Sequence, residues 1–298
     1  MTYTASEKLW GKYYKKFENS IKTENKTIYH YTSSDSMCKI LSNKCIWFSN
    51  ANYLNDESER IYIYRLLKRR VEKHKLNDSF KKEVLEICAM MESDEDSICY
   101  ASAMYNLKNK FIASFSLNQD SLSLWNYYTK DNNMLGYNIG FNLKKFISSK
   151  NKLKQYYLHG KVIYNTKEQF QILDLMLNDY CEEFCKFLKN DEQVHRSFLI
   201  VEFMMILHIF GLFFKHPAYA LEEEYRFIYE PTTKVKYRQK AGLFIPYIEL
   251  PFDTSAVNSI KISPTQKDEI VKNSLIDMLH DKGYSNINIS KSNIPLRY

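Results

Sequence analysis

The sequence predicts an α+β fold, with a mixed, mostly antiparallel sheet and helical insertions. Strand-like and helix-like segments are mixed along the 298 residues without regular β-α-β alternation. The chain contains only 7 Gly and 6 Pro, so few positions demand tight turns, which favours long helices over a many-stranded barrel. Hydrophobic residues make up 45% of the chain and can form a sizeable core. Because no internal repeat or linker is visible, we expect a single α+β domain over residues 1–298.

The first half of the chain predicts strands interrupted by a helical block. Leu9, Tyr13 and Phe17 recur every four residues and form one apolar stripe, which predicts a helix over 5–19. The stretch from about 56 to 107 also has a helical pattern, so we expect a helical insertion between two strand-rich parts. Strand-like segments occur at 27–31, 45–49, 110–116 and 136–141, with a short helix at 121–129.

The second half predicts a long helical pair followed by strands. The pair occupies about 166–215, and its second member contains the intensely apolar segment 198–214. Glu202 and His208 interrupt that segment, so a buried central helix is expected rather than a membrane span, with His208 as a core residue. The remaining elements are a strand or hairpin at 154–164, strands at 224–229, 242–250, 257–263 and 286–290, and a helix at 265–281.

The N-terminal residues, the cysteine spacing and the net charge bear on the cellular location and the partners of the protein. The first residues, "MTYTASEKLWGK", contain no apolar segment of the kind found in signal peptides, so a cytoplasmic protein with reduced thiols and no membrane partner is expected. The six cysteines form no CxxC pair and no zinc-type spacing with histidine. The net charge of +7 is compatible with a polyanionic partner, without demanding one.

Four polar clusters are candidates for a functional site, since P-loop, dinucleotide-binding, HExxH and GxSxG motifs are absent. The alternative for each cluster is a purely structural role, in which its residues cap helices, pack as aromatics in the core or form a network of charges. Their members are His30, Tyr31 and Thr32; Asn55, Asp56 and Glu59; Ser116, Trp125 and Tyr128; and Glu222, Glu224 and Arg226.

The acidic cluster lies in "LEEEYRFIYEP", at the start of a predicted strand. Strand alternation predicts that Glu222, Glu224 and Arg226 share one face and that Glu223 and Tyr225 share the other. A cation between two carboxylates lowers their mutual repulsion and favours their ionised forms. Two ionised carboxylates on one face can hold a ribose hydroxyl or stabilise a developing cation. The alternative is a structural Glu–Arg network at a sheet edge.

Five blocks in a fixed order resemble a known family. They are "YHYTSSDSMCKILSNKCIWFSNANYLNDESE", "SFSLNQDSLSLWNYYTKDNNMLGYNIGF", "FKHPAYALEEEYRFIY", "IKISP" and "SNIPLR". Together they resemble an uncharacterised bacterial family, domain of unknown function 2971, over about residues 28–298. The family is associated with abortive infection and phage defence, and the resemblance implies that setting for this chain.

The order of the clusters is also distantly similar to that of ADP-ribosyltransferases. The resemblance implies a split sheet and NAD as substrate, with His30 orienting the ribose and Tyr128 or Trp125 stacking on nicotinamide. It assigns Glu224 to the nicotinamide ribose and Glu222 to the first acid of an ExE-like pair. The other residues expected to contact NAD are Tyr31, Thr32, Asn55, Asp56, Glu59, Ser116 and Arg226.

These resemblances predict an ADP-ribosyltransferase-like enzyme that modifies a protein or a nucleic acid. The positive net charge tilts the acceptor slightly toward nucleic acid. One alternative is a non-catalytic ligand-sensing or partner-binding module of a defence system. A further alternative is a metal-dependent nuclease, in which oxygen ligands for Mg²⁺ would come from Glu222, Glu224, Asp56 and Glu59.

Overall fold

The computed structural model describes most of the chain in seven stretches, namely residues 5–53, 59–92, 110–129, 135–150, 157–231, 234–266 and 269–295. Within them the chain combines helices with one large, mostly antiparallel sheet, which confirms the predicted α+β class. The chain divides into two compact units. The helical unit comprises Met1–Lys22, Leu54–Lys108 and Gly160–Tyr219, and the sheet unit comprises Thr23–Tyr53, Asn109–His159 and Ala220–Tyr298. That both units form a single domain stays a prediction.

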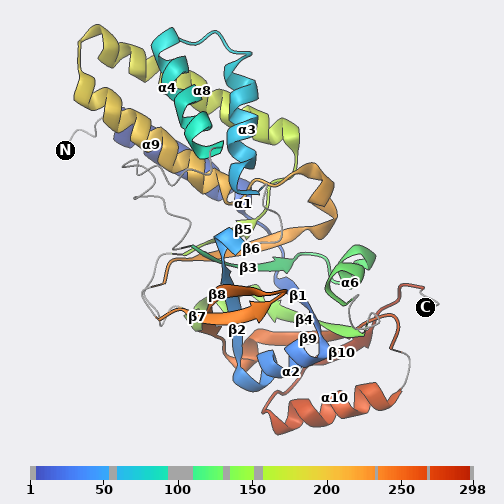
Figure 1. The fold of residues 1–298 in the computed structure, drawn as a ribbon. Helices are drawn as coiled ribbons and strands as arrows, with labels where there is room; N and C mark the ends of the chain where they lie inside the picture. The colour runs from blue at the N-terminus through green and yellow to red at the C-terminus, as the bar shows by residue number, and fades with distance from the viewer. Residues whose placement is uncertain are drawn as a thin grey trace. The chain divides into compact units, whose positions relative to one another are not determined.

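The helical unit is built from antiparallel helices that pack side by side (Figure 1). Their apolar faces meet through edge-on aromatic contacts such as Phe17 with Phe210 and Phe80 with Phe203, whose ring centroids are 5.3 and 6.0 Å apart. The helices are α1 (Ala5–Ile21), α3 (Glu59–Val71), α4 (Asp78–Glu92), α8 (Thr166–Lys189) and α9 (Gln193–Gly211).

Helix α9 contains the intensely apolar segment. Its length and composition would allow it to cross a membrane, but 44% of the segment is buried inside the protein. It packs against α1, α3 and α8, and His208 is buried, as expected for a core helix. This packing is consistent with a soluble protein.

The sheet unit contains short helices and a sheet whose strands run β10-β9-β4-β1-β3-β2-β8-β7, with β6 pairing β3 and β5 pairing β6. The strands are β1 (Thr27–Ser33), β2 (Cys45–Asn50), β3 (Phe111–Ser116), β4 (Gly136–Asn142), β5 (Tyr157–Lys161), β6 (Glu224–Tyr229), β7 (Lys236–Lys240), β8 (Leu243–Pro251), β9 (Val257–Ile262) and β10 (Asn288–Lys291). The helices are α2 (Ser34–Asn43), α6 (Leu122–Thr129), α7 (Leu143–Lys150) and α10 (Glu269–Asp281), and short 3₁₀ turns occupy Ala51–Tyr53, Pro217–Glu222 and Thr254–Ala256.

Strand β3 is where the sheet forks. Along one edge β3 pairs with β6 over its whole length, from Phe111–Tyr229 to Ser116–Glu224. Along its other edge β1 pairs with it only at Ser116, whereas β2 pairs only at Phe111 and Ile112. Strands β1 and β2 therefore separate from a common neighbour, so the sheet is split along β3.

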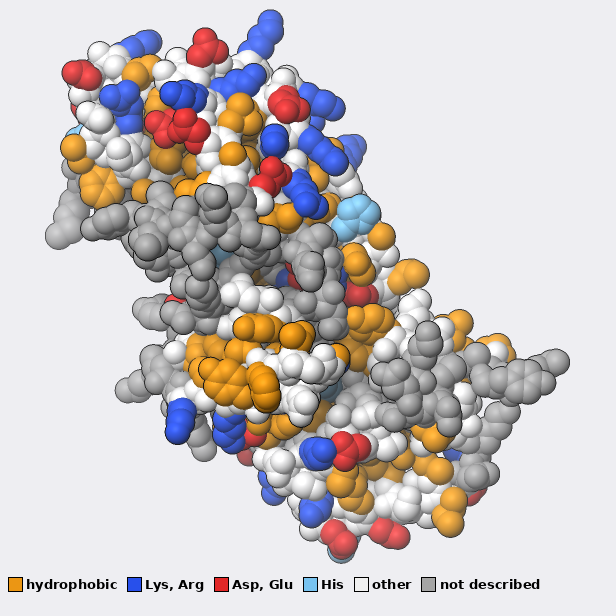
Figure 2. Space-filling model, in the orientation of Figure 1, with side chains coloured by type: hydrophobic (Ala, Val, Ile, Leu, Met, Phe, Trp, Pro, Cys, Tyr) orange, Lys and Arg blue, Asp and Glu red, His pale blue; other side chains and the backbone are white. Residues whose placement is uncertain are grey.

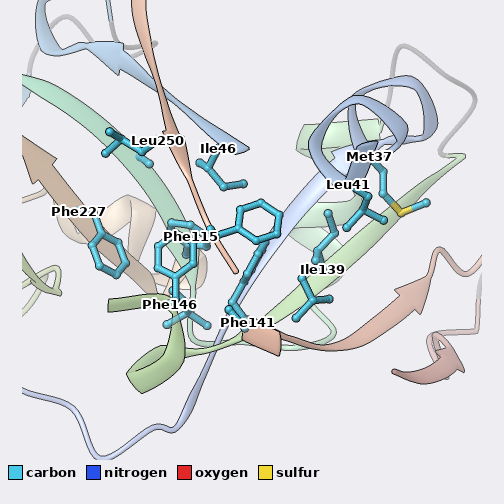
Figure 3. Packing of buried hydrophobic residues seen from close by; sticks show 14 of the residues in the cluster. Met37, Leu41, Ile46, Phe115, Ile139, Phe141, Phe146, Phe227 and Leu250 are labelled. Atoms are coloured by element: carbon cyan, nitrogen blue, oxygen red, sulfur yellow. The ribbon is translucent and has the colours of Figure 1, made fainter. Parts of the chain in front are cut away.

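One face of the sheet carries the hydrophobic core of this unit. Phe115 of β3 lies at its centre, with ring centroids 5.3 to 5.8 Å from those of Phe141, Phe146 and Phe227 (Figure 3). Helices α2, α7 and α10 cover this face and add apolar side chains such as Leu41 and Leu275. The period of two along each strand therefore directs the opposite set of side chains, many of them polar, to the other face.

Replacing Phe141 with Ala is expected to lower the free energy of unfolding by about 3–5 kcal/mol, because it leaves a cavity among the packed phenylalanines. Urea unfolding followed by circular dichroism measures the change. Phe244→Ala is the matched control, since that side chain is 70% exposed and its removal should cost no more than about 0.5 kcal/mol. Equal decreases in the two variants would contradict the assigned core.

Candidate functional site

A charged pair lies on the face of the sheet opposite the phenylalanine core. Glu224 and Arg226 are neighbours on one face of β6, and their side chains are only 4% and 3% exposed. Arg226 Nε donates to Glu224 Oε1 at 2.7 Å and Arg226 Nη2 donates to Oε2 at 2.8 Å, a bidentate geometry. Ser114 Oγ on β3 donates to the same Oε1 at 2.6 Å. The predicted shared face of Glu224 and Arg226 is therefore present, and the carboxylate has a fixed orientation.

Glu222 does not share this face as a strand residue, so that part of the prediction is wrong. The strand begins at Glu224, Glu222 ends a 3₁₀ turn, and Glu223 adopts a left-handed backbone with φ of 43°. The Glu223 carboxylate accepts a hydrogen bond from Asn118 Nδ2 at 2.8 Å. Ser116 Oγ donates to the carbonyl oxygen of Glu222 at 2.7 Å. Glu222 and Glu223 therefore precede the strand, so strand alternation does not set the directions of their side chains.

His30 lies beside the same segment of β3. Its Nδ1 is 3.4 Å from the carbonyl oxygen of Ser114, and its ring packs against Phe115 with centroids 5.5 Å apart. Burial lowers the pKa of His30 to about 4, so the imidazole is neutral near pH 7. Because a carbonyl only accepts, Nδ1 carries the hydrogen in this contact and Nε2 is the acceptor.

Ser114 therefore contacts both predicted catalytic side chains. Its hydroxyl donates to Glu224 and its carbonyl oxygen faces His30. The register nevertheless places Tyr29, not His30, on the Glu224 face, because Tyr29 pairs with Ser116 and Ser116 pairs with Glu224. The structure brings His30 and Glu224 to one residue of β3 from opposite faces of the sheet.

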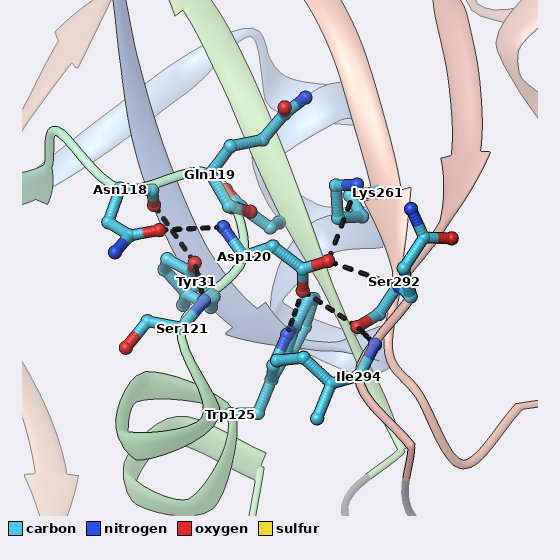
Figure 4. A network of polar contacts seen from close by, with 11 residues as sticks. Tyr31, Asn118, Gln119, Asp120, Ser121, Trp125, Lys261, Ser292 and Ile294 are labelled. Atoms are coloured by element: carbon cyan, nitrogen blue, oxygen red, sulfur yellow. Dashed lines mark hydrogen bonds and ion pairs between the residues drawn. The ribbon is translucent and has the colours of Figure 1, made fainter.

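A second polar network surrounds Asp120, in the loop that follows β3 (Figure 4). Trp125 Nε1 and Ser292 Oγ donate to Asp120 Oδ1 at 2.8 and 2.7 Å. The Asn293 main-chain N–H and Lys261 Nζ approach Oδ2 at 3.2 and 3.5 Å. Burial alone would raise the pKa of Asp120, but these hydrogen bonds and the Lys261 charge lower it. The network joins the loop to β9 and to the segment that follows β10.

This network explains why Trp125 does not serve as a stacking platform. The indole is completely buried and meets the Tyr31 ring edge-on, with centroids 4.8 Å apart. The Tyr31 hydroxyl donates to the Asn118 carbonyl and accepts from the Ser121 main-chain N–H, both at 2.9 Å. Trp125 is therefore a structural residue, and the prediction that it stacks on a ligand ring is wrong. Tyr128, the other predicted stacking residue, is 43% exposed on α6.

The other predicted residues have separate positions. Thr32 is buried on β1, and Ser116 holds the turn at Glu222 and accepts from the Asn118 main-chain N–H at 3.0 Å. Glu59 belongs to the helical unit, where its carboxylate forms an ion pair of 3.0 Å with Lys215. Asn55 and Asp56 lie outside the described residues. In the described stretches, no three His, Cys, Asp or Glu side chains gather as metal ligands would.

The sequence pattern did not reveal the role of Asp120, Asn138, Lys261 or Ser292. Asn138 on β4 donates through Nδ2 to the Gln119 carbonyl oxygen at 2.7 Å and is almost completely buried. Apart from the contact of Asp120 with Trp125, the partners lie far away along the chain, so no local spacing marks these residues. The only local signal was the density of polar residues in "SLNQDS", of which the prediction selected Ser116 alone.

Arg226→Ala is expected to lower the free energy of unfolding by about 3–5 kcal/mol, because it leaves Glu224 buried without its cation. Denaturant unfolding of wild type and variant measures this decrease. Lys39→Ala is the control, since its pair with Asp35 is exposed and should contribute no more than about 1 kcal/mol. A decrease for Arg226→Ala as small as that of the control would show that the buried pair contributes little.

Asp120→Asn is expected to destabilise the protein most at neutral pH. The pKa of Asp120 is lowered by folding, so its stabilisation is complete above the unfolded value near 3.8 and is lost as the pH falls through the folded value. The difference in free energy of unfolding between wild type and variant should therefore shrink from pH about 6 to pH about 3. Asp35→Asn, at an exposed position, supplies the baseline at each pH. A difference that stays constant with pH would contradict the assignment.

Comparisons with known proteins agree with the resemblance seen in the sequence. Residues 124–227 match the family model DUF2971, described as a protein of unknown function. The matched segment begins in α6 and ends in β6, so it includes both Glu224 and Arg226. No curated protein and no solved structure matches the chain. Over residues 124–227, the chain is therefore similar to the DUF2971 family of proteins of unknown function.

Proposed function

We propose that this chain is an ADP-ribosyltransferase-like enzyme that uses NAD as a substrate and modifies a protein or nucleic acid. The observation that supports it most is the arrangement around Ser114. That residue contacts a fixed, charged Glu224 on one side and a neutral His30 on the other. Both lie at the fork of the sheet, and the resemblance assigns both residues to the ribose groups of NAD.

The fork supplies a place where residues from both faces can meet one ligand. Among the described strands, the residues of β3 between Ile112 and Ser116 pair with neither β1 nor β2. A ligand at this edge would have the imidazole of His30 on one side and the carboxylate of Glu224 on the other. In this proposal Nε2 of His30 accepts a hydrogen bond from a ribose hydroxyl, and Tyr128 stacks on nicotinamide.

The proposed reaction breaks the bond between the ribose C1′ and the nicotinamide nitrogen. Nicotinamide leaves with the bonding electron pair, and positive charge develops on the ribose ring as in other glycosidic cleavages. The negative charge of Glu224 stabilises that developing cation, and Arg226 and Ser114 hold the carboxylate in place beforehand. The acceptor oxygen or nitrogen then bonds to C1′ and releases its proton to solvent.

The same contacts also support a second candidate. Glu224 is engaged by Arg226 and Ser114 in the structure, as expected for a structural ion pair in a ligand-sensing module. Such a module would bind NAD or a related nucleotide and raise the melting temperature without any turnover. A cytoplasmic role in defence, which the family resemblance implies, belongs to either proposal.

Glu224→Gln is expected to lower nicotinamide release from NAD by at least about 100-fold, because the neutral amide cannot stabilise the developing cation. Nicotinamide release by the wild-type protein and the variant is measured by chromatography. Total bacterial RNA, single-stranded DNA and cell protein are offered as acceptors. Circular dichroism verifies that the variant is folded.

Glu230→Gln is the matched control, since that carboxylate lies just beyond the same strand and pairs with Lys110, away from Arg226. It should release nicotinamide at the wild-type rate. Equal release by wild type and Glu224→Gln, or no release with any acceptor, would refute the transferase. A thermal shift with NAD in the second case would favour the sensing module.

A further inference from the structure

The strands β2, β7 and β8 carry an aromatic and cationic surface that the proposed reaction does not use. We call it the Trp47 surface, and it consists of Trp47, Ser49, Arg238, Lys240 and Tyr247. Trp47 is 37% exposed, and its ring lies 4.4 Å from that of Tyr247, measured between centroids. The Arg238 guanidinium lies 6.0 Å from the Trp47 ring centroid, within reach of a cation–π contact. Figure 2 shows hydrophobic side chains gathered over this part of the sheet, with Lys or Arg side chains beside them.

The positive charge of Arg238 has no acidic partner in the described part of the chain. Its Nη2 donates to the neutral hydroxyl of Ser49 at 3.0 Å, and its buried Nε has no acceptor. The nearby carboxylate of Glu249 is instead paired with Lys236 at 2.6 Å. Lys240 is exposed and also forms no ion pair with a described residue. Two cations therefore remain to be neutralised by a partner.

The sheet register places this surface on the same face as Glu224. Arg238 pairs with Ile245, and Ser49 pairs with both Tyr247 and Ile112. Ile112 in turn pairs with Ile228, which lies two residues beyond Arg226 on β6. Since directly paired residues share a face, an extended chain lying on the Trp47 surface can continue across the sheet toward Glu224.

We infer that the Trp47 surface binds single-stranded nucleic acid. The exposed indole has the Arg238 guanidinium 6.0 Å from its ring, and Lys240 follows two residues further along β7 on the same face. Such a series of one aromatic ring and two cations matches the alternation of bases and phosphates along a single strand. Trp47 would stack on a base, whose face is accessible only when the strand is unpaired, and Arg238 and Lys240 would contact phosphates. The net charge of +7 assists the encounter. That the bound strand is also the acceptor of ADP-ribose rests on the proposed function.

The test is fluorescence anisotropy with a labelled oligo-dT of about 16 nucleotides, in the absence of NAD. Trp47→Ala should weaken binding by about 5- to 100-fold because a base can no longer stack there. Arg238→Ala should weaken binding and reduce the slope of log affinity against log salt by about 0.7 for each phosphate that the arginine neutralises. A labelled duplex of the same length should bind more weakly than the single strand to wild-type protein.

Tyr237→Ala and Gln239→Ala are the matched controls, because these residues alternate with Arg238 on β7 and point to the other face. They should retain wild-type affinity within about twofold. Trp47→Phe keeps an aromatic ring and should recover most of the affinity, which separates stacking from a folding defect.

Several results would overturn the inference. They are no binding of oligo-dT at about 50 mM salt, equally weakened binding in the Trp47 and Tyr237 variants, and equal affinity for duplex and single strand. Binding of polyglutamate in place of oligo-dT would assign the surface to an acidic protein partner instead. If wild-type protein binds oligo-dT but releases no nicotinamide from NAD, the proposed reaction is refuted and this inference stands.

Discussion

The antiparallel pairing of β3 with β6 sets the arrangement of side chains throughout the sheet unit. Six consecutive pairs fix which side chains of both strands share a face. Phe115 and Phe227 are thereby directed into the core, and Ser114, Glu224 and Arg226 to the opposite face. A slip of one residue would exchange these sets and place a charged pair among the phenylalanines, so register and core composition support each other.

Different interactions stabilise the two faces of the sheet. The core face gains stability from apolar area and close aromatic packing, to which α2, α7 and α10 contribute. The other face holds buried polar groups, which are tolerated because hydrogen bonds to Glu224, Glu222, Asp120 and Gln119 satisfy donors and acceptors there. Such networks cost desolvation energy and are rarely the most stabilising way to fill a fold. Their concentration near the fork supports the proposal that Glu224 acts on a ligand there.

The network around Asp120 shows how distant segments become one structure. Lys261 and Ser292 lie far along the chain from Asp120 and Trp125, yet the Asp120 carboxylate interacts with the other three side chains. The same loop is tied to the turn before β6 through Asn118 and Glu223. The position of Glu224 thus depends on contacts made well outside its own strand.

Local periodicity and composition are enough to predict the α+β class, most of the strands and the burial of α9. They also predict that Glu224 and Arg226 share a face, since both lie within one strand. Strand β7 and helix α7 were not predicted, because "KYRQK" and "LKKFISSK" have few apolar residues to mark a period. Three features became visible in the folded chain alone: the turn that separates Glu222 from Glu224, the burial of Trp125, and the approach of His30 to Ser114 from the opposite face. They depend on strand pairing and long-range hydrogen bonds, whose free energy exceeds any local preference.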